Sequence, residues 1–390
     1  MRYLAWLAVG LVCVGSFGCR AEGDDPGTTP HVDSGPPPGD DGGTTDATRP
    51  PTGDGDVPDP DGGTPSCPCA ALPATCSAPA PNVPTFTPED DALQRQLFDV
   101  VACASTTLQI ASYEVLSDCV VDRLLERLTA APSLELQIVA DNDQCPRDAG
   151  GVLMCPLSRL DGNPRVTIVE DDRDPYMHHK FVIGDGERMW VGSANLSNQS
   201  FCTDHNNALV IEQPEIVAAY QAEFQRLFTD RDFGPLPAGT APTEGGSMTV
   251  YFGPVSPLTD PSPWFNEIIN AIGSATTSVD FIMFAFTRDE ISEALVAAQS
   301  RGVAVRGIVD SSYARDPAVL VLTSALIPLR AGNIHDKSMI IDGRLVVTGS
   351  PNWSMNSWAN NENSLWINDT TVATYYRAEF ERLYSSLPEP

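Results

Sequence analysis

The sequence predicts an α/β protein that contains two tandem copies of one unit. Strand-like and helix-like segments alternate along the chain, which is typical of this fold class. Two segments near the ends of the copies are almost the same, Ala222–Leu227 and Ala378–Leu383. Six residues also occur twice with identical spacing: His178, Lys180, Asp185, Gly192, Ser193 and Asn195, then His335, Lys337, Asp342, Gly349, Ser350 and Asn352. These observations indicate an internal duplication.

The predicted elements follow the same order in both copies. Ser117 precedes a helical segment and can cap it, since serine side chains accept hydrogen bonds from the first turn. In the first copy we expect helices at 89–104, 117–130 and 215–228, and strands at 108–115, 134–140 and 166–169. In the second copy we expect strands at 249–252, 279–284 and 303–309, and helices at 264–272, 291–300 and 372–384. This alternation favours a sheet covered by helices in each copy.

Each repeated motif predicts a strand, a tight turn and a second strand. Alternate residues of a strand share a face, so His178 and Lys180 point one way and His179 points the other. His335 and Lys337 are arranged in the same way around Asp336. Asp-Gly at 185–186 and at 342–343 is a strong hairpin signal. We therefore expect Asp185 and Asp342 to act mainly as turn formers and charge partners behind the site.

The N-terminal region is predicted to direct export. Residues 1–19 have one early charge, a short apolar run and a Gly-Ser-Phe-Gly-Cys ending, as in a secretory signal. The small residues before Cys19 resemble a bacterial lipobox, which would make Cys19 a lipidated residue that anchors the protein at a membrane. Ordinary secretion without lipidation is the alternative reading.

Residues 20–66 are predicted to form a disordered acidic tether. They consist mostly of Gly, Pro, Thr, Ser and Asp, so they lack the apolar surface that would offset ordering entropy. His31 lies in this tether, and we read residues 54–62 as solvated acidic linker rather than as a calcium loop. The whole chain has a net charge of −29, and most of this excess falls after residue 66. Such a charge repels polyanions at long range.

Eight cysteines follow Cys19, and all of them precede the second motif. An even number in an exported protein predicts up to four disulfides. We prefer bridges that hold Cys67–Cys76 against the first copy; their pairing is not readable from the sequence. The predicted organisation is a cysteine-rich first repeat at 67–234, a linker rich in Pro, Gly and Thr at 235–247, and a second repeat at 248–390.

The repeated motif resembles HxKxxxxDxxxxxxGSxN, the signature of the phospholipase D superfamily, over roughly 84–387. The resemblance implies a bilobal body with one active site at a pseudo-twofold seam, and no metal or cofactor. One histidine would attack phosphorus and the other would protonate the leaving group. Family precedent favours His178 as nucleophile and His335 as acid, although the near-symmetric sequence leaves this open. The remaining implied roles are phosphoryl binding by Lys180, Lys337, Asn195 and Asn352, assistance by Ser193 and Ser350, and support by Glu362 and Asn206.

The expected function is hydrolysis of phospholipid headgroup phosphodiesters at a membrane surface by a monomer, with alcohols competing with water. The acidic body disfavours nucleic acid, which usually needs a basic track. Trp264, Trp353 and Trp358 are candidates for exposed aromatic contacts with lipid, or else for packing. His179 and His205 do not fit the motif and are read as structural. A metal-independent endonuclease, and a non-catalytic binding module with buried structural histidines, remain open alternatives.

Overall fold

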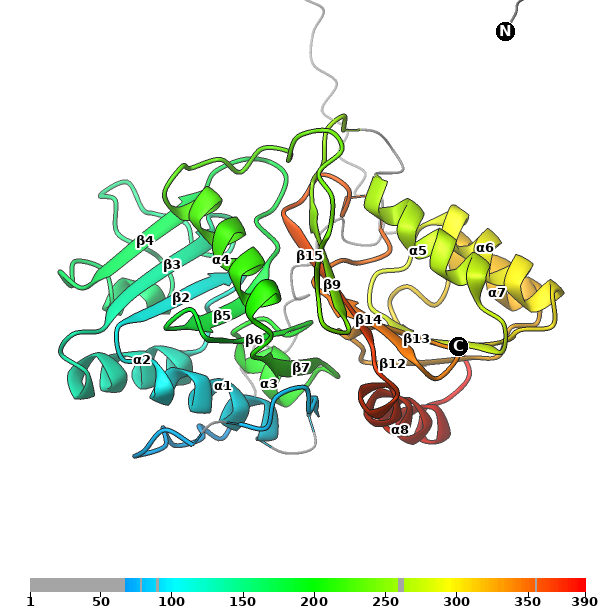
Figure 1. Cartoon of the computed structure of the whole chain (residues 1–390), viewed down its shortest axis with the longest axis horizontal. Helices are drawn as coiled ribbons and strands as arrows, with labels where there is room; N and C mark the ends of the chain where they lie inside the picture. The colour runs from blue at the N-terminus through cyan, green and yellow to red at the C-terminus, as the bar shows by residue number, and fades with distance from the viewer. Residues whose placement is uncertain (1–66, 78, 89–90, 259–262, 355) are drawn as a thin grey trace, which may run out of the picture. The chain divides into compact units, whose positions relative to one another are not determined.

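The computed structural model describes residues 67–77, 79–88, 91–258, 263–354 and 356–390 (Figure 1). The signal sequence, Cys19, His31 and the tether therefore lie outside the described residues. Within the described ranges, no helix combines the length and the apolar character that crossing a membrane requires. These ranges all belong to one compact unit.

The first copy forms a seven-stranded sheet. Its strands are β1 (Thr85–Phe86), β2 (Thr107–Ser112), β3 (Glu135–Asp141), β4 (Val166–Asp171), β5 (Lys180–Gly184), β6 (Arg188–Gly192) and β7 (Asn207–Ile211). Their order across the sheet is β1-β7-β6-β5-β2-β3-β4. The connecting helices are α1 (Ala92–Cys103), α2 (Asp118–Ala130), the short 3₁₀ helix η1 (Pro156–Arg159), α3 (Asn198–Cys202) and α4 (Pro214–Phe228). As predicted, the Ser117 side chain caps α2, accepting from the Val120 N–H.

The second copy forms an eight-stranded sheet. Its strands are β8 (Thr243–Gly245), β9 (Met248–Gly253), β10 (Ser278–Met283), β11 (Ala304–Asp310), β12 (Leu329–Gly332), β13 (Lys337–Ile341), β14 (Leu345–Gly349) and β15 (Glu362–Asn368). Its helices are α5 (Pro263–Ser274), α6 (Asp289–Ser300), α7 (Pro317–Ser324) and α8 (Thr370–Ser386). The order β12-β11-β10-β13-β14-β15-β9 matches that of the first sheet, with β8 added at the edge. The predicted α/β fold with a duplicated unit is confirmed.

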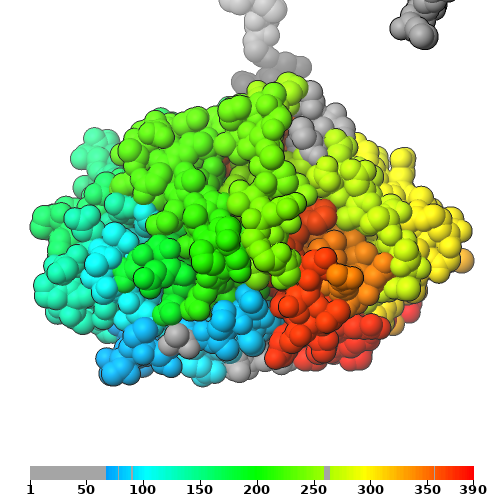
Figure 2. All heavy atoms as spheres, viewed as in Figure 1, coloured from blue at the N-terminus to red at the C-terminus, as the bar shows by residue number. Residues whose placement is uncertain are grey.

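The two ends of the described body are in contact. Phe86 on β1 meets Tyr376 on α8 edge to face, with ring centroids 5.4 Å apart. Figure 2 shows the blue surface of the first copy's start beside the red surface of the last helix. Edge-to-face aromatic pairs are favourable beyond the area that they bury, by about 0.5–1.5 kcal/mol. This contact therefore helps to hold the first and second copies in one body.

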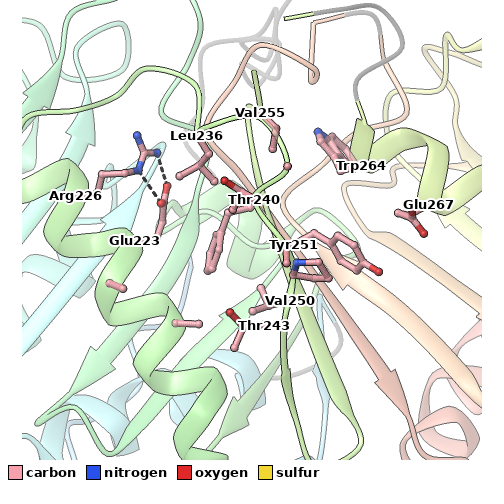
Figure 3. Close-up of a pocket in the computed structure, with 16 residues that line it drawn as sticks. Glu223, Arg226, Leu236, Thr240, Thr243, Val250, Tyr251, Val255, Trp264 and Glu267 are labelled. Carbon is pink, nitrogen blue, oxygen red and sulfur yellow. Dashed lines mark hydrogen bonds and ion pairs between the residues drawn. The ribbon is translucent and has the colours of Figure 1, made fainter. Parts of the chain in front are cut away.

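The segment predicted as a linker contains a strand. Residues 236–243 pass between α4 and β9 and lead into β8, which pairs antiparallel with β9 (Figure 3). β8 has only three residues, Thr-Glu-Gly, so it lacks the apolar alternation that marks a strand. Its position at the edge of a sheet comes from tertiary pairing with β9 rather than from its own propensity.

The described residues contain four disulfides, at Cys67–Cys202, Cys69–Cys119, Cys76–Cys103 and Cys145–Cys155. The first three attach the segment from Cys67 to Cys76 to α3, α2 and α1 of the first copy. The prediction that bridges staple this segment onto the first repeat is confirmed. All four bonds lie in the first copy, and among the described residues the second copy has none.

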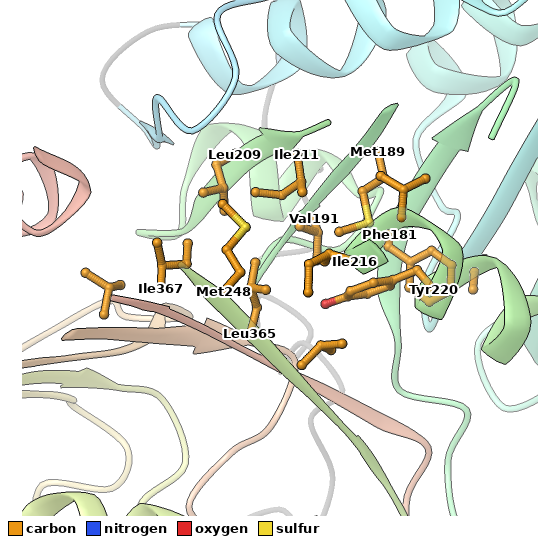
Figure 4. Close-up of a cluster of buried hydrophobic side chains, with 14 of the residues drawn as sticks. Phe181, Met189, Val191, Leu209, Ile211, Ile216, Tyr220, Met248, Leu365 and Ile367 are labelled. Atoms are coloured by element: carbon orange, nitrogen blue, oxygen red, sulfur yellow. The ribbon is translucent and has the colours of Figure 1, made fainter. Parts of the chain in front are cut away.

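Three hydrophobic clusters define a layered body. One packs α1 and α2 on the outer face of the first sheet, and another packs α5, α6 and α7 on the second. The third joins the inner faces of both sheets with α4 and α8, and includes Phe181, Met189, Met248 and Leu365 (Figure 4). Fully burying one such side chain contributes roughly 1.5–3 kcal/mol. Residues from both copies share this central core, which fixes the motif strands next to one another.

The tryptophans proposed as exposed lipid contacts are not exposed. Trp264 and Trp353 are 5% and 2% exposed, and Trp358 packs partly buried against the same outer core. The correct reading was the packing alternative, because indole rings supply large apolar area to a core. These residues therefore give no support for an aromatic membrane contact.

Candidate active site

The motif strands β5 and β13 are buried along their whole length. Each is followed by a hairpin turn in which the motif aspartate has positive φ, 52° for both Asp185 and Asp342. Asp185 accepts hydrogen bonds from the N–H groups of residues 105–107, and Asp342 accepts from those of residues 276–278. Burial alone would raise the pKa of Asp185, but these donors lower it to about 2; the pKa of Asp342 is lowered in the same way.

These aspartates lie at the opposite ends of the motif strands from the lysines. The structure therefore assigns Asp185 and Asp342 to the hairpins, as turn formers that anchor the preceding strand. Their carboxylates accept from backbone donors away from the histidines, as expected of turn formers behind the site.

Glycine in each Gly-Ser pair lets two chain segments approach closely. A Cβ on Gly192 would come within 2.1 Å of the Asn207 carbonyl oxygen, and one on Gly349 equally close to that of Asn363. Gly349 also has φ of 134°, which L-residues rarely adopt. The approach allows the N–H groups of Ser193 and Ser350 to donate to the same two carbonyls. This contact places Asn206 beside Ser193 and Glu362 beside Ser350.

Backbone hydrogen bonds bring the two motifs together across the copies. The His178 N–H donates to the carbonyl of Asn361, 3.0 Å away, and the His335 N–H donates to the carbonyl of His205 at the same distance. Each motif histidine is thus held by the segment that follows the other copy's motif. The residue next along that segment, Glu362 or Asn206, then meets the imidazole of the opposite copy.

Glu362 orients His178. The His178 Nδ1 lies 2.8 Å from both carboxylate oxygens of Glu362, and both side chains are buried. The Ser350 hydroxyl donates to the same carboxylate at 2.5 Å. With Nδ1–H donated to a carboxylate, the lone pair of Nε2 is left for chemistry, and positive charge on the ring is stabilised.

Asn206 takes the equivalent position at His335, with an amide in place of the carboxylate. The His335 Nδ1–H donates to Asn206 Oδ1 at 2.9 Å, and the Ser193 hydroxyl donates to the same oxygen. The Asn206 NH₂ group donates to the Ser200 carbonyl, which fixes the orientation of the amide. An amide can orient the ring but cannot stabilise imidazolium by charge. The two motif histidines therefore have unequal support, with the carboxylate at His178 and the amide at His335.

The serines and lysines have distinct surroundings. Ser193 and Ser350 are bonded to the orienting residues Asn206 and Glu362, so the structure gives them a supporting position. Lys180 Nζ donates to the His178 carbonyl at 3.1 Å, and Lys337 Nζ donates to that of His335 at 2.8 Å. Lys337 Nζ also lies 3.1 Å from His335 Nε2. Each ammonium is therefore held beside the histidine of its own strand.

The motif asparagines are also buried beside the histidine strands. Neither side-chain polar atom of Asn195 has a hydrogen-bond partner, although the residue is fully buried. Asn352 Oδ1 accepts from the Ala285 N–H at 3.4 Å. A buried amide without a partner costs free energy, which a ligand with hydrogen-bond acceptors would recover. Asn195 is therefore suited to donate to a phosphoryl oxygen.

Sequence reasoning missed a pair of aspartates behind the histidines. Asp141, at the end of β3, accepts from the Met177 N–H at 2.8 Å, and Asp310, at the end of β11, accepts from the Ile334 N–H at 2.9 Å. Each donor directly precedes a motif histidine. Burial raises the pKa of Asp141 to about 7. The available signal was an aspartate at the end of the corresponding strand in both copies.

Aromatic rings at equivalent positions were also missed. Tyr113 lies 5.2 Å from the His178 ring, and Phe284 lies 4.9 Å from the His335 ring, between centroids. The ammonium groups of Lys180 and Lys337 lie over the same two rings. Each motif histidine and lysine therefore packs against one aromatic ring, whose apolar surface strengthens electrostatic interactions beside it.

The side chains of the two predicted structural histidines bond to residues other than the motif residues. His179 is buried between Asn363 and Glu223, with 3.1 Å to each. The His205 Nδ1–H donates to the Thr87 carbonyl at 3.0 Å. Asp336, the counterpart of His179, accepts from the Asn207 side chain, and burial raises its pKa to about 7. Among the described residues, no group of three His, Cys, Asp or Glu side chains is arranged to hold a metal ion.

A duplicated α/β body with two buried His-Lys pairs at the junction of its copies defines a class of phosphodiester-cleaving proteins. The sequence profile of the family described as "Cardiolipin synthase, PLD-like domain" matches residues 97–228 and 268–384. This chain therefore belongs to the phospholipase D superfamily, as the motifs predicted.

Individual relatives match parts of the chain. Mitochondrial cardiolipin hydrolase of Xenopus laevis is 33% identical over 135 residues, covering 33% of this chain and 64% of the relative. The protein of the same name from Homo sapiens is 32% identical over 126 residues, covering 30% of this chain and 50% of the relative. This chain thus spans less than two thirds of the length of these relatives.

A solved structure supports the fold over a longer range. Phosphatidylserine synthase from Haemophilus influenzae Rd KW20 superposes with a TM-score of 0.58 at 13% identity. The match covers 78% of this chain and 87% of the synthase. At this level of identity the likeness shows a shared fold that includes both copies.

Proposed function

We propose that this member of the superfamily hydrolyses phospholipid headgroup phosphodiesters through a covalent phosphohistidine. The observation that carries the mechanism is the unequal support of the two histidines. Glu362 contacts the Nδ1 of His178 with a carboxylate, whereas Asn206 contacts that of His335 with an amide. This difference supports different chemical tasks for the two histidines.

His178 is the proposed nucleophile. Its Nε2 attacks phosphorus, a P–N bond forms, and the P–O bond to the leaving alcohol breaks. The resulting N-phosphorylated ring with Nδ1–H carries positive charge, which the carboxylate of Glu362 stabilises. An amide in this position would orient the ring without stabilising that charge.

His335 is the proposed general acid and then general base. Its Nε2–H is transferred to the leaving oxygen, which departs as an alcohol. The nearby Lys337 ammonium and the uncharged Asn206 both favour release of this proton. Neutral His335 next removes a proton from water, which attacks phosphorus and breaks the P–N bond. An alcohol in place of water would give transphosphatidylation.

The remaining motif residues would bind the phosphoryl group. Lys180 and Lys337 supply two positive charges, and Asn195 supplies an N–H donor that lacks a partner. These groups are held in place before substrate arrives, so they need little reorganisation as negative charge develops. This charge is the contribution that a metal ion makes in other phosphodiesterases.

Two observations support phospholipid over nucleic acid as the substrate. The chain carries a net charge of −29, which repels polyanionic nucleic acid at long range. The relatives at about a third identity are named for cardiolipin, a phospholipid. We also propose, from the sequence, that the protein is exported, anchored through Cys19 and active as a monomer at a membrane surface.

The test compares turnover on lipid and nucleic acid. Purified protein in chelator would be incubated with vesicles of phosphatidylethanolamine, phosphatidylcholine or cardiolipin, and separately with single- and double-stranded DNA. The proposal expects release of headgroup alcohol and no DNA cleavage, with loss of turnover in both His178→Ala and His335→Ala. DNA cleavage alone would make the protein a nuclease, and inactivity on both classes would favour a binding module.

A further inference from the structure

The residue between each motif histidine and lysine belongs to a second row of contacts, on the reverse face of the motif segment. His178 meets Glu362, and the next residue, His179, meets the next residue of the opposite segment, Asn363. The two segments run parallel at this point. The contact between His179 and Asn363 therefore helps to fix the register that places Glu362 opposite His178.

The other junction has the same two rows with the opposite polarity. Next to the pair of His335 and Asn206 comes the pair of Asp336 and Asn207. The Asn207 NH₂ group donates to Asp336 at 2.9 Å, so the amide is the donor here. Next to His178, the partner of the amide is a histidine rather than an aspartate. The two copies therefore support their motif histidines with different chemistry on the reverse face.

Both ring nitrogens of His179 face an acceptor. The Asn363 NH₂ group donates to the Tyr220 hydroxyl at 3.2 Å, which leaves its carbonyl oxygen 3.1 Å from Nδ1 of His179. On the other side, Nε2 lies 3.1 Å from a carboxylate oxygen of Glu223. His179 therefore donates to Asn363 and to Glu223. The ring links α4 to β15, the strand that carries Glu362.

Glu223 is itself held in place. It forms a two-pronged ion pair with Arg226, at 2.8 and 2.9 Å (Figure 3). Arg226 also donates to the carbonyls of Asp232 and Gly234, just after α4. Burial alone would raise the pKa of Glu223, but His179 and Arg226 lower it to about 2. The carboxylate is therefore ionised at neutral pH and is a strong acceptor for His179.

This ion pair lies in the segment that occurs almost unchanged in both copies. Glu379 and Arg382 take the same positions in the second copy and form the same two-pronged pair, at 2.6 and 2.7 Å. There the nearby buried residue is Asp336, whose pKa is raised by burial and further by the negative charge of Glu379. The repeated pair thus holds a histidine in the first copy and faces an acid in the second.

Asn363 passes the support from His179 on to Glu362. It directly follows Glu362 in β15, and its N–H donates to the Ser350 hydroxyl at 2.9 Å. That hydroxyl donates to the Glu362 carboxylate. A shift of Asn363 would therefore move both the backbone of Glu362 and a donor to its carboxylate. His178 would then lose the alignment of its Nδ1–H with that carboxylate.

We propose that His179 is a positioning residue for His178, a role that rests on the proposed phosphodiesterase function. Held from α4 by Glu223, its ring fixes Asn363. Asn363 in turn fixes Glu362 against the Nδ1 of His178. This role involves no contact with substrate, so its loss should lower kcat and leave KM nearly unchanged.

Two substitutions separate the two contacts of the ring. The amide nitrogen of asparagine can take the place of Nδ1, and that of glutamine can take the place of Nε2. His179→Asn therefore keeps the bond to Asn363 and loses the one to Glu223, whereas His179→Gln does the reverse. Each variant is thus the matched control of the other, because each loses one buried hydrogen bond. A residue that only stabilises the fold would show no preference for the Asn363 side.

Turnover on phospholipid vesicles gives the first readout. We expect His179→Gln to lower kcat at least about tenfold and His179→Asn at most about threefold, with KM within about threefold in both. If a His179 variant does not fold, the same contact is tested from its other side. Asn363→Asp keeps an acceptor for the ring and should lower kcat less than Asn363→Leu, which removes it.

The Nδ1–H proton of His178 gives a readout that does not need turnover. In protein with isotope-labelled histidine, its nuclear magnetic resonance signal is the one that His178→Ala removes. The signal should keep its position in His179→Asn and be shifted or lost in His179→Gln. If the unmodified protein cleaves no phospholipid, the proposed function fails, and this signal alone decides the positioning role.

Three results would overturn the proposal. They are equal kcat in the two His179 variants, a higher kcat in His179→Gln than in His179→Asn, and a His178 signal that His179→Gln leaves unchanged.

Discussion

Replacement of Glu362 by glutamine probes the charge behind the proposed nucleophile. Glu362 is 1% exposed, and its carboxylate lies 2.8 Å from the Nδ1 of His178. Glutamine has the same shape and can still orient the ring, so the change removes charge and little else. It also makes the support of His178 resemble the amide support that Asn206 gives to His335.

The size of the effect follows from the type of bond that is lost. A hydrogen bond to a charged group contributes about 1.5–3 kcal/mol when buried. This bond strengthens as the phosphorylated ring becomes positive, so its loss falls on the transition state rather than on substrate binding. At about 1.4 kcal/mol per factor of ten, kcat should fall roughly 10- to 150-fold while KM stays within about threefold.

Steady-state release of headgroup alcohol from vesicles measures both constants. Glu381→Gln is a control of the same chemistry at an exposed ion pair with Arg306, and should leave kcat unchanged within twofold. If Glu362→Gln keeps full kcat, or raises KM alone, charge stabilisation of His178 is not part of the mechanism.

Three further predictions concern the fold. Burial raises the pKa of Asp336 to about 7, so this group favours the folded state most below pH 4 and loses that contribution as pH rises through 7. The free energy of unfolding should therefore fall between pH 4.5 and pH 8, and Asp336→Asn should make this fall smaller by at most roughly 4 kcal/mol. Urea titrations at the two pH values measure the difference. A disulfide that closes a longer loop removes more entropy from the unfolded chain. Removing the Cys67–Cys202 bridge, which spans 135 residues, should lower the free energy of unfolding by about 5 kcal/mol, and removing Cys145–Cys155, which spans 10, should lower it by about 3 kcal/mol. Equal losses would contradict this dependence on loop length. Gly349→Ala should abolish turnover and lower the melting temperature, whereas Gly273→Ala, which meets no neighbour, should not; a Gly349→Ala protein with normal activity would show that the close approach is dispensable.

Local features of the site could be predicted from the sequence because they depend on short-range chemistry. Strand alternation placed His178 beside Lys180, and the Asp-Gly pairs indicated the hairpins, where Asp185 and Asp342 adopt positive φ. The Ser117 cap was equally local. Duplication added a second, independent occurrence of each feature, which is why the fold class followed from one sequence.

Features that depend on the contact between copies could not be predicted. Glu362 follows the second motif, yet it supports the histidine of the first, because backbone hydrogen bonds exchange these segments across the junction. The aspartates Asp141 and Asp310 end strands in both copies, but their roles need the positions of Met177 and Ile334 in space. Strand β8 is too short and too polar to show the alternation of apolar and polar residues that predicts a strand. It forms because it pairs with β9.

The most direct test of the central claim, that histidines from the two copies act as one nucleophile and one acid, uses a phosphodiester with a nitrophenyl leaving group. This group departs without an acid, so His335→Ala should release one nitrophenolate per protein and then stop, because the base for the second step is missing. Mass spectrometry should find the phosphoryl group on His178, and His178→Ala should give no burst. A burst in His178→Ala, or phosphate on any other residue, would contradict the account.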